Sequence, residues 1–196
     1  MGPRPAGRGE GAAGGQDPGA QAWVEARARG APIPKEHRTY EALSKAPPIF
    51  PSPEEHPVVR MGSYATLTAA NPRFPSEDGG NDALISYLLD HGVEASQIET
   101  IDGQYGDPEP SIIVYDPPRD VLFDAGRRFG QESVLVVEGR RNQLVFTNGE
   151  LAGKAHPGSG HERHEQRPDD YFSRVSTGAG DLFWTNALNF KAIEDA

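Results

Sequence analysis

Cysteine is absent from this 196-residue chain, which excludes a disulfide framework, a thiol nucleophile and any cysteine-ligated zinc site. Long apolar runs are lacking too, since no stretch approaches the ~20 residues that a membrane-spanning helix needs. The first residues are rich in Gly and Ala and have no apolar segment typical of a secretory signal. We therefore expect a cytoplasmic protein without membrane contacts.

Basic residues are scarce in the middle of the chain. Residues 61–152 contain six Lys or Arg and fifteen Asp or Glu, a net charge of −9, whereas the whole chain carries −10. Proteins that bind nucleic acid non-specifically need Lys and Arg to displace counterions from the phosphates. This acidic segment would repel phosphates instead, so non-specific nucleic-acid binding is not expected.

Apolar residues make up only 36% of the chain, while 23 Gly and 18 Pro are present. This composition lies between globular and disordered averages, and it predicts that the two characters are segregated along the chain. Residues 1–57 hold much of the Gly and Pro and are expected to form a disordered or extended leader. The alternative is a docking segment that places Ile49 and Phe50 on a partner.

Residues 58–152 carry the periodic patterns of an α+β domain. Tyr64, Thr66 and Thr68 alternate with smaller or apolar residues, as in a strand. Two amphipathic helices are expected between further strands, and the predicted order is β-α-β-β-α-β-β. This order predicts a ferredoxin-like sandwich, one sheet with two helices on one face, with extended N- and C-terminal tails.

Residues 153–196 are predicted to form a polar loop followed by an apolar docking stretch. Phe183, Trp184, Leu188 and Phe190 stand close together near the C-terminus. Such a stretch is not expected to lie free in water. We expect these side chains either to cover the open face of the sheet or to bind a partner protein.

A set of polar residues falls at the ends of the predicted strands. In a ferredoxin-like arrangement the first and third strands are antiparallel neighbours, so the end of one lies beside the start of the other. The candidate ligand-binding residues are Asn71, Tyr105, Glu109, Ser111, Gln131 and Glu132. In the functional interpretation a carboxylate acts as base and amides orient a ligand; in the structural one these residues cap turns and satisfy backbone donors.

The same segment resembles a small uncharacterised family of bacterial and phage proteins. The resemblance covers residues 62–138 and is carried by Ala69-Ala70-Asn71-Pro72, Glu109-Pro110-Ser111 and Phe129-Gly130-Gln131. Between Tyr105 and Glu109 this chain has three residues, where the family tends to place the aromatic directly before the acid. The family implies no established activity. If the chain comes from a phage, the virion is a second possible location.

Two further clusters were considered as sites. His156, His161 and His164 lie among acidic residues, but Gly- and Pro-rich sequence provides no scaffold for a metal, so no metal and no cofactor are expected. Four arginines at positions 127, 128, 140 and 141 are interpreted as solvated or as complementing a helix dipole.

The sequence therefore leaves two hypotheses for the function. The first is a small acidic accessory protein of bacterial or phage origin that binds a protein partner through its tails. The second is a small-ligand-binding or hydrolytic enzyme that uses a polar pocket around Asn71, Glu109 and Gln131. The sequence decides neither whether the chain is an enzyme nor its oligomeric state.

Overall fold

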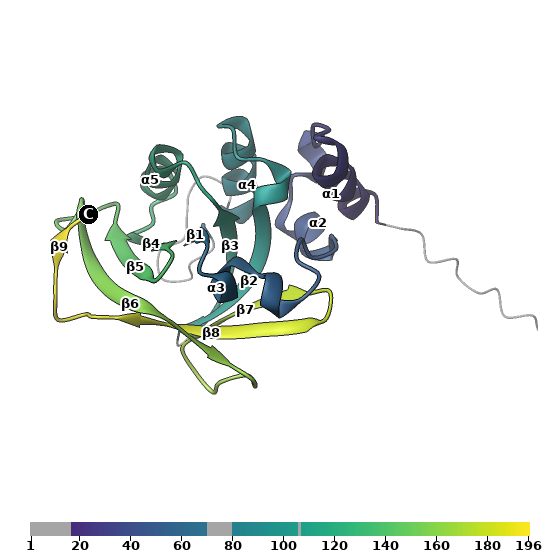
Figure 1. Ribbon diagram of the computed structural model, residues 1–196. Helices are drawn as coiled ribbons and strands as arrows, with labels where there is room; N and C mark the ends of the chain where they lie inside the picture. The colour runs from purple at the N-terminus through teal and green to yellow at the C-terminus, as the bar shows by residue number, and fades with distance from the viewer. Residues whose placement is uncertain (1–16, 70–79, 106) are drawn as a thin grey trace, which may run out of the picture.

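The computed structural model describes residues 17–69, 80–105 and 107–196, apart from the Tyr105 side chain. Eight antiparallel strands form a closed barrel, and helices cover one side of it (Figure 1). The barrel strands are β1 (Ser63–Leu67), β2 (Ile98–Tyr105), β3 (Asp107–Tyr115), β4 (Ser133–Glu138), β5 (Arg141–Phe146), β6 (Lys154–His164), β7 (Phe172–Thr177) and β8 (Gly180–Leu188).

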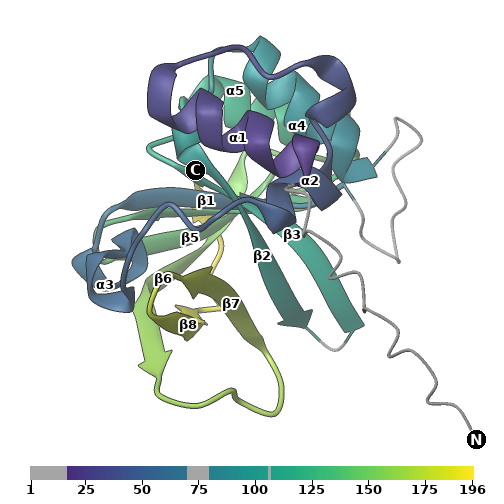
Figure 2. The same cartoon turned by 90° about the vertical axis from the view of Figure 1, so that its right-hand side faces the viewer.

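The helices lie mainly in the first two thirds of the chain. They are α1 (Pro18–Arg29), α2 (Tyr40–Lys45), α3 (Pro57–Arg60), α4 (Gly80–Asp90) and α5 (Arg119–Arg128), with short 3₁₀ turns at Lys35–His37, Pro53–Glu55 and Ala95–Gln97. In Figure 2, α1, α2, α4 and α5 lie together above the strands. No helix in the described part of the chain has the length and apolar character needed to cross a membrane.

The strand order shows how the barrel closes. It runs β5-β4-β1-β3-β2-β7-β8-β6, and β6 returns to pair with β5 through Leu144↔His156 and Val145↔Ala155. A two-residue strand, β9 (Glu194–Asp195), adds to one end of β6. Closure satisfies the backbone donors and acceptors that open sheet edges would expose.

The predicted ferredoxin-like sandwich is therefore wrong. Such a sandwich would leave β2 and β5 as the two edges of one open sheet. Instead, β2 pairs with β7 at Asp102↔Arg174 and Gln104↔Phe172, β5 pairs with β6, and β8 joins β7 to β6. The error arises after residue 147, because three of the eight strands come from the segment that was expected to be a loop and a docking stretch.

Between residues 63 and 146 the individual elements agree better with the expectation. The two helices α4 and α5 and the strands β1 to β5 occur in the predicted order, and β1 is an antiparallel neighbour of β3. The strands β2 and β3 form a long hairpin, in which β2 continues to Tyr105 and β3 begins at Asp107.

Side chains alternate between the two faces of each strand, so the molecule has one core outside the barrel wall, under the helices, and one core inside the barrel. On β1, Tyr64 faces the barrel interior, whereas Ala65 and Leu67 pack under the helices. The outer core lies between the helices and the strands β1 to β6, and it includes Trp23, Leu84 and Leu122. The inner core fills part of the barrel. Both faces of these strands are buried, which explains their nearly continuous apolar sequence.

Residues 17–57 differ from the leader that their composition predicts. Asp17 caps α1 by accepting hydrogen bonds from the backbone N–H groups of Gly19 (2.9 Å) and Ala20 (3.1 Å). Trp23 is fully buried in the outer core, and its indole N–H donates to the carbonyl of His37 at 3.0 Å. One large side chain thus anchors a helix whose average hydropathy is low.

Candidate functional site

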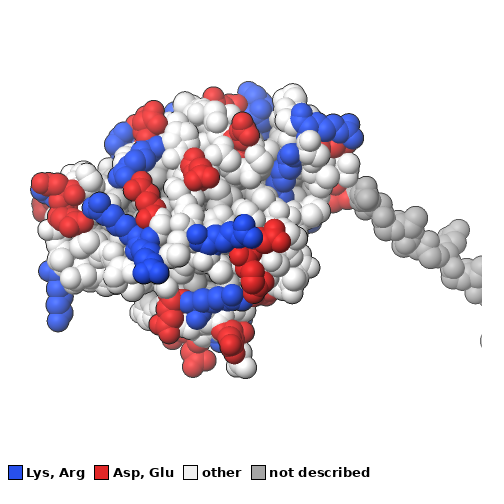
Figure 3. Space-filling model, in the orientation of Figure 1, with Lys and Arg blue, Asp and Glu red and all other residues white. Residues whose placement is uncertain are grey.

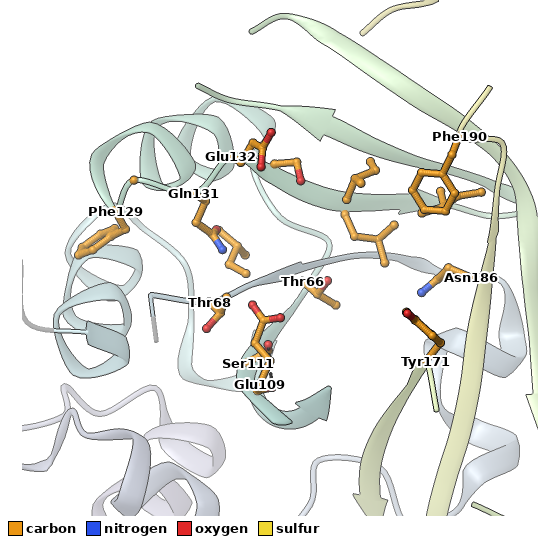
Figure 4. A pocket seen from close by; sticks show the side chains of 16 residues that line it. Thr66, Thr68, Glu109, Ser111, Phe129, Gln131, Glu132, Tyr171, Asn186 and Phe190 are labelled. Atoms are coloured by element: carbon orange, nitrogen blue, oxygen red, sulfur yellow. Dashed lines mark hydrogen bonds between the residues drawn. The ribbon is translucent and has the colours of Figure 1, made fainter. Parts of the chain in front are cut away.

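One end of the barrel contains a cavity of about 460 Å³. The cavity lies where β1 ends and its antiparallel neighbours β3 and β4 begin, and the end of β8 borders it on the other side (Figure 4). Its apolar wall consists of Leu67, Phe129, Leu135, Leu144, Leu188 and Phe190. Its polar wall consists of Thr66, Thr68, Glu109, Ser111, Gln131, Glu132, Ser133, Tyr171 and Asn186.

Four of the six candidate ligand-binding residues border this one cavity. They are Glu109, Ser111, Gln131 and Glu132. Asn71 lies outside the described residues, and so does the side chain of Tyr105, whose backbone ends β2. Glu109 and Ser111 lie near the start of β3, and Gln131 and Glu132 directly precede β4; both strands are antiparallel to β1, so their starts lie beside the end of β1. The sequence argument covered the first and third strands and left the position of Gln131 open.

The backbone of Gln131 is held in place on several sides. Its N–H donates to the carbonyl of Gly126 at 2.9 Å, and its carbonyl accepts from the Thr147 hydroxyl at 2.6 Å and from the Asn148 amide at 2.6 Å. Gly126 lets α5 approach the barrel wall closely, because a Cβ there would lie 2.8 Å from Thr147 Cγ2. The Gln131 side chain therefore projects from a fixed point.

Two amide side chains in the cavity wall have hydrogen-bonding capacity left over. Gln131 Oε1 and Asn186 Oδ1 are buried atoms that accept no hydrogen bond from the described residues. In Figure 4 both amide nitrogens point toward the cavity. Buried polar atoms in folded proteins nearly always have partners, so an unpaired amide beside a cavity suggests that a ligand or water completes the set.

Two hydroxyl groups of the wall donate to backbone carbonyls. Ser111 donates to the backbone carbonyl of Glu109 at 3.2 Å, and Thr68 donates to the carbonyl of Pro110 at 2.9 Å. The described lining includes no His, Lys or Arg side chain, and the carboxylates of Glu109 and Glu132 are its groups that could accept a proton. In the described lining, Ser111 therefore has no histidine or lysine base of the kind that activates a serine nucleophile.

The four predicted partner-binding residues are distributed over three different environments. Trp184 is fully buried in the inner core, so a partner cannot contact it in this structure. Phe183 faces the opposite side of β8 and packs edge-on against Phe172, with ring centroids 5.8 Å apart. Leu188 and Phe190 border the cavity. The apolar stretch thus belongs mainly to the barrel, as part of the strand β8.

The closed part of the barrel contains a buried hydrogen-bonded chain. His56 Nδ1 accepts from the Val58 N–H at 3.2 Å, so Nε2 carries the proton and donates to the Tyr115 oxygen at 2.7 Å. The Tyr115 hydroxyl donates to Glu99 Oε2 at 2.7 Å, and Glu99 Oε1 accepts from the backbone N–H of Ile49. Every heteroatom of the chain has at least one partner.

Burial changes the pKa values of all three groups. It lowers the pKa of His56 to about 3, with a smaller contribution from nearby His161. It raises the pKa of Glu99 and raises that of Tyr115 well above 10, the latter with the Glu99 charge as a second cause. Glu99 also borders a second, more polar cavity of about 330 Å³ between the N-terminal helices and the strands β2 and β7.

The histidine side chains of β6 do not share one set of partners. The Nδ1 atom of His156 donates to the carbonyl of Ala192 at 2.7 Å, His164 contacts the Thr185 hydroxyl at 3.0 Å, and burial lowers the pKa of His161. Within the described part of the chain, no group of three or more His, Asp or Glu residues is arranged to hold a metal ion.

Sequence reasoning missed Asn186 and Tyr171 as residues of the cavity. A signal for Asn186 was present, since Leu182, Trp184, Asn186 and Leu188 alternate with the remaining residues of β8. This period of two places one amide in an otherwise apolar row that faces the barrel interior. Tyr171 had no comparable signal, because it precedes β7 in a polar loop.

Comparison with known proteins identified no relatives: no protein-family model, curated protein or solved structure matches this chain. The resemblance to a bacterial and phage family stays a prediction.

Proposed function

We propose that this protein binds a small, uncharged organic molecule in the cavity at the end of its barrel. The observation that supports the proposal best is the combination of an apolar wall with two unpaired amides, those of Gln131 and Asn186, in a cavity of about 460 Å³. Small-molecule sites are typically concave, mostly apolar and provided with a few polar groups that orient the ligand.

The polar groups favour an uncharged ligand over an anion. The described lining contains two carboxylates, Glu109 and Glu132, and no basic side chain. A primary amide can present its oxygen or, after a half turn, its nitrogen, so it pairs with neutral donors and acceptors alike. Ligands with amide, hydroxyl or ring-nitrogen groups fit this description.

Binding of a partner through flexible tails is less well supported. Residues 17–57 pack in helices against the barrel, and Trp184, the largest residue of the apolar stretch, is buried. Hydrolysis through a serine nucleophile is also less well supported, because the Ser111 hydroxyl donates to a backbone carbonyl instead of to a base.

The proposal can be tested with the neutral fluorophore N-phenyl-1-naphthylamine, which brightens on transfer from water to an apolar site. We expect one molecule to bind per chain. Ser133→Phe, which fills the cavity from β4, should weaken binding at least about tenfold, the effect of losing ~1.4 kcal/mol of contacts. Ser96→Phe makes the same change at an exposed position remote from the cavity and serves as the matched control.

Leu188→Trp fills the cavity from the opposite wall and provides a second variant if Ser133→Phe fails to fold. Equal binding by the wild type and by both cavity-filling variants, each folded by circular dichroism, would show that the probe binds elsewhere and would contradict the proposal.

A further inference from the structure

The mouth of the cavity contains two exposed aromatic rings. Tyr171 and Phe190 are each 65% exposed, and both border the cavity. Only five large hydrophobic residues in the described part of the chain are exposed, so two of the five lie at this one opening. Single exposed apolar residues are ordinary, whereas two at one opening indicate a contact surface.

Phe190 is held rigidly despite its exposure. It lies in a turn fixed by the Asn189 N–H, which donates to the carbonyl of Pro157 at 2.7 Å, and by the Ala192 N–H, which donates to Asn189 at 3.1 Å. Its ring packs edge-on against His156, with centroids 5.3 Å apart. The His156 ring packs in the same way against Phe146, also at 5.3 Å. A ring fixed before binding loses little conformational entropy when a ligand stacks on it.

Tyr171 has a backbone conformation that aromatic residues rarely adopt. Its φ angle is +57°, in the left-handed region that favours glycine. The next residue, Phe172, is buried on the outer side of the barrel, whereas Tyr171 borders the cavity and its hydroxyl points into it in Figure 4. Strain of this kind persists where the surrounding structure requires it and is often found at binding sites.

Asn186 lies between the two aromatic residues. In Figure 4 it projects from β8 with Phe190 on one side and Tyr171 on the other. Its amide nitrogen points toward the cavity in Figure 4, whereas its buried Oδ1 has no partner among the described residues. Two rings beside one amide make a combination suited to a flat molecule with a polar edge.

We infer that the ligand contains a planar aromatic or heteroaromatic ring, which stacks on Tyr171 or Phe190 and places a polar ring edge against the Asn186 amide. This inference rests on the proposed function of the same cavity. The chemical class is that of uncharged heteroaromatic lactams and amides, whose edge carries one donor and one acceptor and so matches a carboxamide.

A matched pair of probes tests the inference. 2-Quinolinone is planar and aromatic, and decahydroquinolin-2-one has the same lactam edge and skeleton without the planar ring. We expect calorimetry to show that 2-quinolinone binds the wild type at least about tenfold more tightly, since aromatic stacking adds affinity beyond the buried area. Tyr171→Ala with Phe190→Ala should remove this difference, because it weakens binding of 2-quinolinone more than binding of the saturated probe.

Asn186→Leu should weaken both lactams, whereas Gln166→Leu, which changes an exposed amide outside the cavity lining, serves as the control. The inference is overturned if the two probes bind equally, or if the double alanine variant keeps the preference. Loss of both probes in Ser133→Phe would then still support a binding cavity, whereas probes unaffected by Ser133→Phe would contradict the proposed function itself.

Discussion

At the scale of single residues, the buried polar groups are of two kinds: some bond one another, and others have no partner among the described residues. In the closed part of the barrel, His56, Tyr115 and Glu99 satisfy one another in a buried chain. At the open end, Gln131 and Asn186 keep buried amide oxygens without a described partner. A satisfied buried network contributes rigidity, whereas an amide beside a cavity can bond a ligand through the end that faces the cavity. Asn142, His161 and Trp184 also have unpaired buried atoms, but only Gln131 and Asn186 of these described residues line the cavity.

His56 should make the protein less stable in acid. Its pKa is about 6.5 in the unfolded chain and is lowered to about 3 by burial, so between these values only the unfolded chain takes up the proton. The stability due to neutral His56 is therefore present above pH 6.5 and is lost as the pH falls, by at most about 1.4 kcal/mol per pH unit. His161, whose pKa burial also lowers, acts in the same direction.

Urea unfolding of the wild type and His56→Gln at pH 7.5, 6.5, 5.5 and 4.5 would test this expectation. The variant should be less stable at pH 7.5 because the chain to Tyr115 is altered, but its stability should fall less steeply toward pH 4.5. Exposed His91→Gln is the control and should keep the slope of the wild type. Parallel curves for the wild type and His56→Gln would refute a titrating role for His56.

Burial raises the pKa of Glu99, so the contribution of Glu99 to stability has the opposite pH dependence to that of His56. For this reason the role of His56 is read from the difference between the wild type and the variant.

At the scale of elements, α1 is an integral part of the outer core. Trp23 is buried at 0% exposure, and the Arg27 guanidinium donates to the carbonyls of Ala95 at 3.2 Å and Ile98 at 2.8 Å. These contacts join the helix to the start of β2. Packing of a few side chains thus stabilises a helix whose own sequence has weak amphipathic character.

Trp23→Ala should lower the free energy of unfolding by about 3–5 kcal/mol, because it removes a large side chain from a packed site and leaves the His37 carbonyl without its indole donor. Arg29→Ala, at an exposed position of the same helix, should change it by less than about 0.5 kcal/mol. Urea unfolding followed by circular dichroism measures both. Similar midpoints for the two variants would mean that α1 does not contribute to the folded core.

Elements with a local pattern of apolar residues could be predicted from the sequence, whereas elements held by a few specific contacts could not. Helices α4 and α5 have clear periodicity and strand β4 is a nearly continuous apolar run, and these elements were predicted. Helix α1 was missed because one tryptophan and a few polar contacts hold it. Strand β6 was missed because Pro157, Gly158 and Gly160 interrupt its alternation, and Asn142 fills the space that a side chain at Gly158 would need.

The candidate site was predicted in part for a related reason. Ser111 stands at the start of a strand whose pairing with β1 follows from local patterns, so its place beside the end of β1 could be argued without the whole fold. The position of Gln131, before β4, was left open by the same patterns. Asn186 and Phe190 reach the same cavity only because β8 closes the barrel, and closure depends on long-range pairing that no local pattern specifies.

At the scale of the whole molecule, charge is distributed without large patches of one sign on the face in Figure 3. Acidic and basic side chains are interspersed there over the described residues. Arg174, for example, pairs with both Asp102 and Asp181, which links β2, β7 and β8 at the surface. Exposed pairs of this kind contribute little to stability, so the closed barrel depends chiefly on its interior.

Closure by β8 should be essential for folding, whereas β9 should be dispensable. Removing residues 193–196 deletes a two-residue strand that pairs only with the end of β6, and the melting temperature should fall by only a few degrees. Removing residues 180–196 takes away buried Leu182 and Trp184 and leaves β6 and β7 without their common partner. This chain should show no cooperative thermal transition and should aggregate, because it exposes the inner core and two strand edges. Circular dichroism and light scattering would distinguish the two truncations.

The contradicting outcome is a chain without residues 180–196 that melts cooperatively near the wild-type temperature. The layer of β1 to β5 with its helices would then be stable alone, and the barrel strands after residue 147 would serve the cavity but not the fold.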